Sequence, residues 1–517
     1  MSTSAQSQMP QTVAPFGDSD LPEGWTAATI GKVADVVGGG TPSTSDPANF
    51  SDDGHPWITP ADLSDFQGAW IKRGKRGLTE KGLRTSSATP MPKGTVLMSS
   101  RAPIGYVAIA ANPIATNQGF KSFVLGSGLM SEFCFYWLKF LGPYLQEMGS
   151  GSTFLEISGS RARDIPFLVA PTAEQQRIVT KIEDLLAQVN AVRARLAGVA
   201  QVLKRFRQAV LAAACSGRLT EDWRERHPNI EFASDLVIRV HNGRTEARNR
   251  KKDGSVKEAE ELFETPSSWV WVSFGSVCND ITVGHVGPMA HQYRETGVPF
   301  LRSQNVREFR FDPTGLKYIS REFHNTLRKS ALSPGDVVVV RSGFAGVACV
   351  IPQSLKQANC ADLVVIRPSD ALNPQYACIF VNSNEGRAHV DEVKVGIAQS
   401  HFNIGSARMT PFPLPPIEEQ NEIVRRVDAL FSHADSVEKQ VAVAMKRADK
   451  LTQAILAKAF RGELVPTEAE LARREGRNYE PASVLLERIR ASRERIPQRA
   501  QRRITSRKIR TGTRKDS

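Results

Sequence analysis

The stretch PTAEQQRIVTKIEDLLAQVNAVRARLAGVAQVLKRFRQAVLAAACSGRL, residues 171–219, recurs without insertion or deletion as PIEEQNEIVRRVDALFSHADSVEKQVAVAMKRADKLTQAILAKAFRGEL, residues 416–464. The offset is a constant 245 positions, and 15 of the 49 aligned residues are identical. Each copy follows a block of about 150 residues, a common domain size, that begins at Trp25 or Trp269. The chain is therefore one unit written twice, a globular block and then a helical segment.

Apolar residues in the first copy recur at alternating steps of four and three, the 3.5-residue period of a coiled-coil seam. Thr172 with Gln175 has the pattern of a capping box, Pro416 suits a helix entrance, and Gly217 and Gly462 suit helix exits. The alternative is two ordinary amphipathic helices, each packed on its own block. We predict that the helix or partner interface contains Ile178, Ile182, Leu185, Val189, Leu196, Leu203, Ile423, Val427, Leu430, Val437, Leu451 and Ile455.

Each helix starts directly at the end of its own block, which favours antiparallel pairing. Parallel helices would force the linker to travel back along their full length. We predict an α+β fold in which two similar α/β domains are joined by two long antiparallel coiled-coil helices with pseudo-two-fold symmetry. The expected segments are a disordered N-terminus (1–20), a first domain (21–170), a helical region (171–219), a linker (220–264), a second domain (265–415), a second helical region (416–464) and a basic C-terminal tail (465–517).

The net charge of +13 is concentrated at the C-terminus, where the last 34 residues, from Val484, hold 12 basic and 3 acidic side chains. Such a run predicts a disordered or marginally helical tail that either touches nucleic acid or only adds solubility. The six cysteines form no CxxC pair, so we expect reduced thiols and no metal site. The sequence has neither a long uncharged apolar run nor a signal-peptide pattern, which predicts a cytoplasmic protein without a membrane span.

Basic side chains cluster at equivalent places in the two blocks, and two hairpin patterns, residues 92–109 and 334–348, each carry an arginine at the turn. Lysine mostly grips phosphate, whereas arginine, asparagine and glutamine can read base edges. The alternatives are a solvated face and arginines that tie down their own turns. We predict DNA-binding roles for Lys72, Arg73, Lys75, Arg76, Arg84, Arg101, Arg302, Gln304, Asn305, Arg307, Arg310 and Arg341.

Motifs of the relevant enzymes are missing from the sequence. It contains no Gly-x4-Gly-Lys-Ser/Thr loop for ATP, and no Asn/Asp-Pro-Pro-Tyr/Phe tetrapeptide of the kind that holds a flipped adenine in aminomethyltransferases. We therefore predict no catalytic residues and no enzymatic activity for this chain alone.

The chain resembles the specificity subunit of type I restriction-modification systems over nearly its whole length, from Leu21 to about Leu464. The motifs that carry the resemblance are Pro56-Trp-Ile-Thr-Pro-Ala-Asp-Leu63, Ser99-Ser-Arg-Ala-Pro-Ile-Gly105, Thr116-Asn-Gln-Gly-Phe120, Arg163-Asp-Ile-Pro-Phe167, Pro171-Thr-Ala-Glu-Gln-Gln176 and, in the second half, Pro413-Leu-Pro-Pro-Ile-Glu-Glu-Gln420 and Gln453-Ala-Ile-Leu-Ala457. Their order and duplication are more specific than any one of them.

The resemblance implies that the blocks are target recognition domains, each reading half of a split double-stranded DNA site, and it adds Asn117 and Gln118 to the DNA-binding residues. It implies that the helices set the spacing and hold two modification (methyltransferase) subunits, which are joined by restriction subunits. No cofactor is expected on this chain; S-adenosylmethionine would belong to the modification subunit, and ATP and Mg to the restriction subunit. A fused methyltransferase-nuclease and a protein-binding coiled-coil adaptor are the alternative classes.

Overall fold

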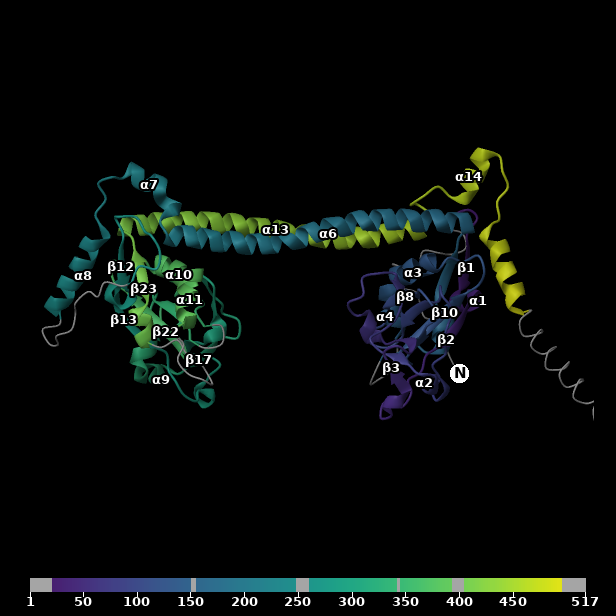
Figure 1. Cartoon of the computed structure of the whole chain (residues 1–517), viewed down its shortest axis with the longest axis horizontal. Helices are drawn as coiled ribbons and strands as arrows, with labels where there is room; N and C mark the ends of the chain where they lie inside the picture. The colour runs from purple at the N-terminus through teal and green to yellow at the C-terminus, as the bar shows by residue number, and fades with distance from the viewer. Residues whose placement is uncertain (1–20, 150–154, 248–259, 342–344, 393–403, 495–517) are drawn as a thin grey trace, which may run out of the picture. The chain divides into compact units, whose positions relative to one another are not determined.

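The computed structural model describes residues 21–149, 155–247, 260–341, 345–392 and 404–494. These form two compact units: the first combines the chain up to Arg195 with the chain from Ala444, and the second spans Leu196–Val443. Each unit holds one of the two blocks and a segment of each long helix (Figure 1). The mixture of helices and sheets confirms the predicted fold class. The N-terminal segment predicted to be disordered lies outside the described residues.

The block of the first unit is built on a five-stranded sheet with strand order β2-β10-β7-β8-β5, beside a smaller sheet of order β3-β6-β4-β9. The predicted hairpin is confirmed, since β7 pairs antiparallel with β8, and both are fully buried apolar runs, as expected for a sheet covered on both faces. The elements are β1 (Thr26–Thr29), α1 (Ile30–Val33), β2 (Ala34–Gly38), β3 (Phe50–Ser51), β4 (His55–Ile58), β5 (Trp70–Ile71), β6 (Gly77–Leu78), α2 (Glu80–Arg84), β7 (Val96–Ser99), β8 (Val107–Ala110), β9 (Ala115–Thr116), β10 (Phe120–Leu125), α3 (Ser131–Phe140), α4 (Gly142–Met148), α5 (Gly159–Arg163) and β11 (Pro166–Val169).

The block of the second unit repeats this plan with two four-stranded sheets, β13-β22-β19-β20 and β17-β14-β21-β18. The second predicted hairpin is also confirmed, as β19 pairs antiparallel with β20. The elements are β12 (Val270–Ser273), β13 (Cys278–Val283), β14 (Val298–Leu301), β15 (Val306–Arg307), β16 (Arg310–Phe311), β17 (Lys317–Ile319), α9 (Arg321–Thr326), β18 (Ala331–Leu332), β19 (Val337–Val340), β20 (Ala348–Val350), β21 (Ala358–Cys360), β22 (Leu363–Pro368), α10 (Pro374–Asn382), α11 (Asn384–Glu392), α12 (Ile404–Met409) and β23 (Pro411–Leu414).

Two 44-residue helices, α6 (Thr172–Cys215) and α13 (Ile417–Phe460), carry the repeated sequence, as predicted. Within each unit, contacts advance along the first helical segment while they recede along the second, so the helices run antiparallel. The paired positions are Arg177 with Glu468 and Arg193 with Asp449 in the first unit, and Arg207 with Asp435 and Leu219 with Arg426 in the second.

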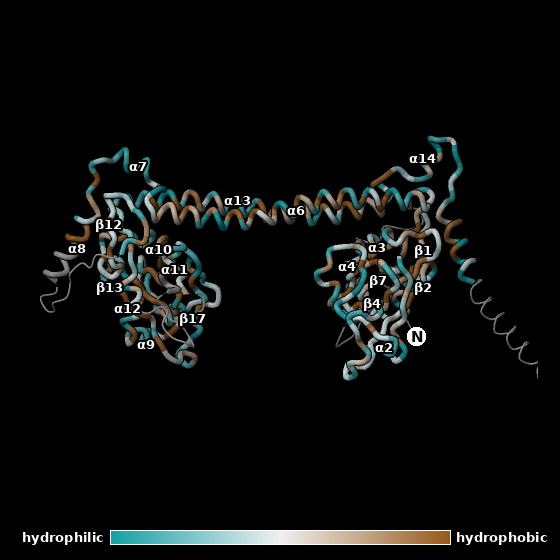
Figure 2. Tube along the Cα trace, viewed as in Figure 1, coloured by the Kyte–Doolittle hydropathy of each residue, from teal (hydrophilic) through white to brown (hydrophobic). Residues whose placement is uncertain are grey.

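The predicted seam is buried along most of both helices, and the helical segments alternate hydrophobic and hydrophilic residues (Figure 2). It joins the core of the adjacent block, so each helical segment packs both on its partner helix and on a block. The buried seam residues include Ile178, Ile182, Val189 and Ile455 in the first unit, and Leu203, Ile423 and Val427 in the second. Leu185, Leu196, Leu430 and Val437 are half-buried.

Leu451 is an exception to the seam, because its side chain is 51% exposed. Near this level of the first unit, the guanidinium of Arg193 crosses to Asp449 Oδ1 (2.7 Å) and Thr452 Oγ1 (3.1 Å). The contact between the helices is polar here, and it is made by Thr452 in place of Leu451. Leu451 therefore does not pack within the helix pair, and its place at a partner interface stays a prediction.

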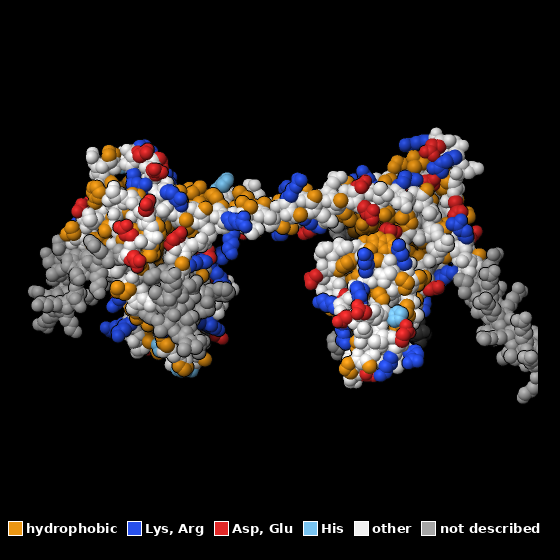
Figure 3. Space-filling model, viewed as in Figure 1, with side chains coloured by type: hydrophobic (Ala, Val, Ile, Leu, Met, Phe, Trp, Pro, Cys, Tyr) orange, Lys and Arg blue, Asp and Glu red, His pale blue; other side chains and the backbone are white. Residues whose placement is uncertain are grey.

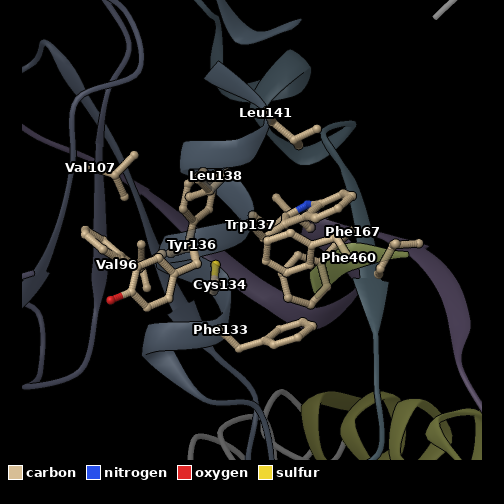
Figure 4. Close-up of a cluster of buried hydrophobic side chains, with 14 of the residues drawn as sticks. Val96, Val107, Phe133, Cys134, Tyr136, Trp137, Leu138, Leu141, Phe167 and Phe460 are labelled. Atoms are coloured by element: carbon tan, nitrogen blue, oxygen red, sulfur yellow. The ribbon is translucent and has the colours of Figure 1, made fainter. Parts of the chain in front are cut away.

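The end of α13 enters the core of the first block through Phe460. Its fully buried ring lies 5.3 Å from the ring of Phe133, 5.0 Å from that of Trp137 and 5.6 Å from that of Phe140. Figure 4 shows Phe133, Trp137, Phe167 and Phe460 pointing toward one another. The equivalent end of α6, in the second unit, carries the smaller and equally buried Cys215.

A buried hydrogen bond joins the start of each block to the start of a long helix in both units. Trp25 Nε1 donates to Glu174 Oε1 (2.7 Å), and Trp269 Nε1 donates to Glu419 Oε2 (2.8 Å). Both carboxylates are fully buried. Glu174 also accepts from the backbone amide of Glu468 (2.8 Å). The identity of Glu174 and Glu419 in the sequence repeat thus reflects one structural role performed twice.

The segments that follow the two helices also repeat. In the second unit, α7 (Glu221–Arg226) and α8 (Ala233–Ala247) lie within the predicted linker. In the first unit, α14 (Glu468–Glu475) and a helix over residues 482–494 occupy most of the described part of the predicted tail. Ala233 N donates to Ser268 O, and Ala482 N donates to Gly24 O, at equivalent places before the two tryptophans.

Part of the C-terminal segment predicted to be disordered or marginally helical is ordered against the first block. Leu485, Leu486 and Ile489 are buried in its core, and Arg493 Nη2 lies 2.6 Å from Asp35 Oδ1. The high charge misled the prediction because the apolar residues of this stretch occupy one face of a helix. Residues 495–517 lie outside the described part of the chain.

All six cysteines are buried thiols. Cys134 lies in the first unit; Cys215, Cys278, Cys349, Cys360 and Cys378 lie in the second. Burial raises the pKa of Cys349 to about 12. None of the described helices combines the length and apolar content needed to cross a membrane.

Candidate nucleic-acid interface

The basic cluster of the first block lies on the loop between β5 and β6 and on α2. The predicted residues Lys72, Arg73, Lys75, Arg76 and Arg84 are all exposed. Asp62 fixes this loop, because its carboxylate accepts from the backbone amides of Thr59 (2.8 Å) and Lys75 (2.9 Å). The structure therefore places Lys72, Arg73, Lys75 and Arg76 on one tied loop and Arg84 on the helix that follows β6. Figure 3 shows that the viewed face of this unit also mixes in acidic side chains.

Arg76 is held over an aromatic ring. Its guanidinium carbon lies 3.9 Å from the centroid of Phe50, a distance that favours a cation–π contact. The ring of Phe50 in turn lies 6.0 Å from that of Trp57. One face of the guanidinium is thus covered, and its edge remains open to solvent.

The second block places a cation and a ring at the same point of its fold. The strand pairs β4–β6 and β14–β17 correspond, which makes Lys317, directly opposite Phe300, the counterpart of Arg76. Lys317 Nζ lies 5.9 Å from the ring of Tyr293, and the guanidinium of Arg302 lies 5.7 Å from the same ring. Both units therefore pair an exposed cation, at or directly before the start of a corresponding strand, with a half-buried aromatic ring.

Asn305, predicted to read bases, is fully buried. Its side-chain oxygen accepts from the backbone amide of Arg302 (3.1 Å), and its side-chain nitrogen donates to the carbonyls of Asp312 (2.9 Å) and Thr314 (3.2 Å). Asn305 is the counterpart of Asp62 and shapes the loop. The prediction of a base contact is wrong for this residue, because its amide has no exposed face.

The other predicted residues of this cluster reach the surface. Arg302 Nη2 and Gln304 Nε2 both donate to the carbonyl of Gly315, at 3.0 and 3.3 Å. Arg307 Nε lies 3.4 Å from the carboxylate of Asp312, and Arg310 is exposed. These side chains lie around one loop, and their DNA contacts stay predictions.

Arg101 lies just after β7, and the Nε of its guanidinium is held by a hydrogen bond. Its Nε donates to Glu156 Oε2 (2.9 Å), while Lys121 Nζ lies 3.3 Å from Glu156 Oε1 and 3.4 Å from Ser100 Oγ. Partial burial works to raise the pKa of Glu156, but the hydrogen bonds from Arg101 and Lys121 outweigh it and lower that pKa. The carboxylate therefore remains ionised between two cations.

Asn117 and Gln118 lie on the neighbouring turn between β9 and β10. Asn117 Oδ1 accepts from the backbone amide of Gly119 (2.9 Å), and the exposed Gln118 accepts from the hydroxyl of Thr41. This turn is joined to that of Arg101 by the bond from Ser100 N to Gly119 O (2.7 Å). The structure thus gathers the residues of two predicted motifs at one end of the paired strands β7 and β10.

Arg341 is not the counterpart of Arg101. The turns close through Gly105 N to Ser99 O and through Gly346 N to Val340 O, both 3.0 Å, which aligns Arg341 with Ser100. The Nε of Arg341 is buried without a hydrogen-bond partner among the described residues. The counterpart of Arg101 is Ser342, which lies outside the described residues. The two hairpins therefore share their strand pairing and the hydrogen bond that closes the turn, and they differ in the residue, Ser100 or Arg341, that follows the first strand.

Sequence reasoning missed Glu156, Lys121 and the two rings, Phe50 and Tyr293. An acidic residue and single aromatic residues distant in sequence from the basic clusters give no local pattern. Arg76 and Lys317 become comparable only through the equivalent strand pairs β4–β6 and β14–β17. No cluster of side chains that could hold a metal ion occurs in the described part of the chain.

Comparison with known proteins agrees with this architecture. The profile of the type I restriction modification DNA specificity domain matches residues 22–200. The specificity subunit of the type I restriction enzyme EcoKI from Escherichia coli K12 is 30% identical over 464 residues, covering 86% of this chain and 90% of that relative. The MjaIX specificity subunit from Methanocaldococcus jannaschii is 42% identical over 170 residues, and this match covers 32% of the chain and only 39% of that relative.

A solved structure from work on the assembly and conformational transition of the type I R-M system has the same fold, with a TM-score of 0.60 at 20% identity over 86% of this chain and 99% of that one. The match to the EcoKI subunit extends over nearly the whole of both proteins. The chain therefore belongs to the specificity subunits of type I restriction-modification systems, the non-catalytic components that recognise DNA sequence.

Proposed function

We propose that the two blocks read the two halves of a bipartite DNA target. The observation that carries this is a shared frame with different side chains at its DNA-facing turns. The buried Trp–Glu bonds and the loop-fixing residues Asp62 and Asn305 recur in both units. At the hairpin turn, by contrast, Ser100 is replaced by Arg341. A constant frame with variable turns is what two unrelated half-sites require.

The recurring cations suit a contact that is the same for any sequence. Arg76 and Lys317 lie at or directly before the start of corresponding strands, and each lies over an aromatic ring. Phosphates are identical at every step of the duplex, so a cation kept in both blocks fits phosphate better than a base. Arg101 and Gln118, which belong to the variable turns, are our candidates for base readout in the first half-site.

The long helices would fix the spacer between the half-sites. On B-DNA each base pair adds about 3.4 Å and about a tenth of a turn, so two readers on a rigid connection accept one spacing only. Exposed apolar residues remain on the helices, Val192 and Leu451 in the first unit and Val202 and Val443 in the second. They support docking of two modification subunits on this part of the chain.

In this proposal the modification subunits bind S-adenosylmethionine and methylate adenine in each half-site. Restriction subunits, which use ATP and Mg, would add cleavage. The specificity chain itself supplies DNA recognition and assembly, in the cytoplasm.

Sequencing of adenine methylation in the host, with and without this gene, tests the proposal. We expect one motif of two short, unrelated half-sites and a fixed spacer to lose methylation when the gene is deleted. Replacing residues 21–170 by the corresponding block of a relative should change one half-site and leave the other half-site unaltered. A target without an unread spacer, or a replacement that changes both halves, would contradict it.

A further inference from the structure

Glu156 is an acidic residue beside Arg101, on a turn that we propose contacts DNA, and negative charge there repels phosphate. Its side chain is 32% exposed and lies against Arg101 and Lys121, the latter only 12% exposed. A carboxylate at such a place is expected to have a role whose benefit outweighs its repulsion of phosphate.

The contact with Arg101 occupies one edge of the guanidinium. Glu156 Oε2 accepts from Nε, and the side chain of Arg101 is still 46% exposed. Guanine is read by two parallel donors of arginine, and the outer pair of amino nitrogens is one such fork. A fixed Nε therefore leaves a fork available and removes the rotational freedom that a long side chain would otherwise lose on binding.

We propose that Glu156 is a positioning residue for base readout, which holds Arg101 in the orientation that selects a guanine in the first half-site. This inference rests on the proposed function. It adds a residue that does not itself touch the base and that is defined by its contact with the reader.

The main chain allows this role to be separated from folding. Arg101 and Glu156 form an isolated antiparallel bridge, and Ile157 N donates to Ser100 O (2.9 Å). These backbone contacts do not depend on the carboxylate. Removing the side chain of Glu156 should therefore leave the two segments adjacent while freeing Arg101.

Lys121 offers a competing role for Glu156, which is to neutralise a buried ammonium. If that were the only role, losing the carboxylate would destabilise the block and weaken binding to every sequence alike. Replacing Lys121 by methionine would then rescue the Glu156 variant. The two roles are distinguished by discrimination between sequences.

The test uses the full chain with its co-produced modification subunits and duplexes that carry the methylated target or one changed base pair in the first half-site. Glu156→Ala should reduce discrimination at the base read by Arg101 by roughly tenfold, as expected for an impaired bidentate contact. Discrimination in the second half-site should not change. Glu156→Gln, which retains a neutral acceptor, should lose less.

The Arg101→Ala and Glu156→Ala changes should be non-additive, since both act on one contact. Glu80→Ala is the matched control, because Glu80 is an 83% exposed acidic residue of the same unit whose ion pair is with His55. Full discrimination by Glu156→Ala, uniform weakening rescued by Lys121→Met, or additive losses would each overturn the inference. Absence of discrimination by the wild-type complex would instead refute the proposed function.

Discussion

Phe460→Ala tests how firmly α13 is anchored in the first block. The ring is fully buried and touches three other aromatic rings at centroid distances of 5.0–5.6 Å. Phenylalanine-to-alanine changes in cores cost about 3–5 kcal/mol, and the ring contacts place this one near about 4–5 kcal/mol. For a unit of this size that corresponds to a fall of about 8–20 °C in the unfolding midpoint.

Cys215→Ala is the matched change at the repeat-equivalent position in the second unit. It removes a single buried atom and should cost about 1 kcal/mol, close to the loss of one methylene. Because the two cores are separate clusters, the Phe460 variant should lower one unfolding transition and the Cys215 variant the other.

Urea unfolding followed by far-UV and near-UV circular dichroism measures both effects. Two transitions are expected, so each is fitted on its own. The near-UV signal should lose intensity in the Phe460 variant, because Phe133 and Trp137 lose their partner ring. A cost below about 1 kcal/mol, or equal shifts of both transitions in both variants, would refute the assignment of Phe460 as an anchor.

Four further results are expected. Glu174→Ala leaves Trp25 Nε1 and the amide of Glu468 without an acceptor and should cost about 2–6 kcal/mol in urea unfolding, whereas Glu174→Gln should cost less. Glu422 has its pKa lowered to about 2, chiefly by Arg425, so its stabilisation exists above its ordinary pKa and is lost as the pH falls toward 2; Glu422→Gln should flatten acid unfolding in that range, and an unchanged profile would contradict this. Arg76→Gln should weaken binding to all duplexes alike and reduce the slope of log K against log salt by about one; altered base preference would count against a phosphate contact. Insertion of four residues into α6 should change the spacer or abolish binding, and methylation of the original site with the original spacer by a complex of the folded variant would show that the helices do not fix the spacer.

The helices could be predicted from the sequence because their periodicity is local and is written twice. The seam residues Ile182 and Val427 are buried as the pattern required. Leu451 lies outside the helix pair because the polar contact of Arg193 with Asp449 depends on a partner 256 residues away in the chain. A period of 3.5 residues describes the average spacing of apolar contacts along the helix pair. It does not predict a single level at which a polar contact replaces apolar packing.

The site was predicted less well, since residue type alone does not tell a base reader from a loop-fixing residue. Asn305 has the chemistry to read adenine, but its amide is consumed by three backbone contacts. Glu156 lies 55 residues from Arg101 and carries the wrong charge for a DNA surface, so no sequence pattern indicated it. The hairpins were predicted because alternating apolar runs and glycine turns are short-range signals.

The buried thiols allow transient opening of each core to be measured by chemical labelling. A thiol buried in an apolar core stays protonated and reacts only when the surrounding structure opens. Cys134 is alone in the first unit, whereas the second unit contains five such groups. The rate at which a thiol reagent modifies Cys134 would therefore report how often the core of the first unit opens. The rate of modification of the other five cysteines would report how often the core of the second unit opens. Native protein labelled over time and analysed by mass spectrometry would thus show which half of this duplicated chain opens more often.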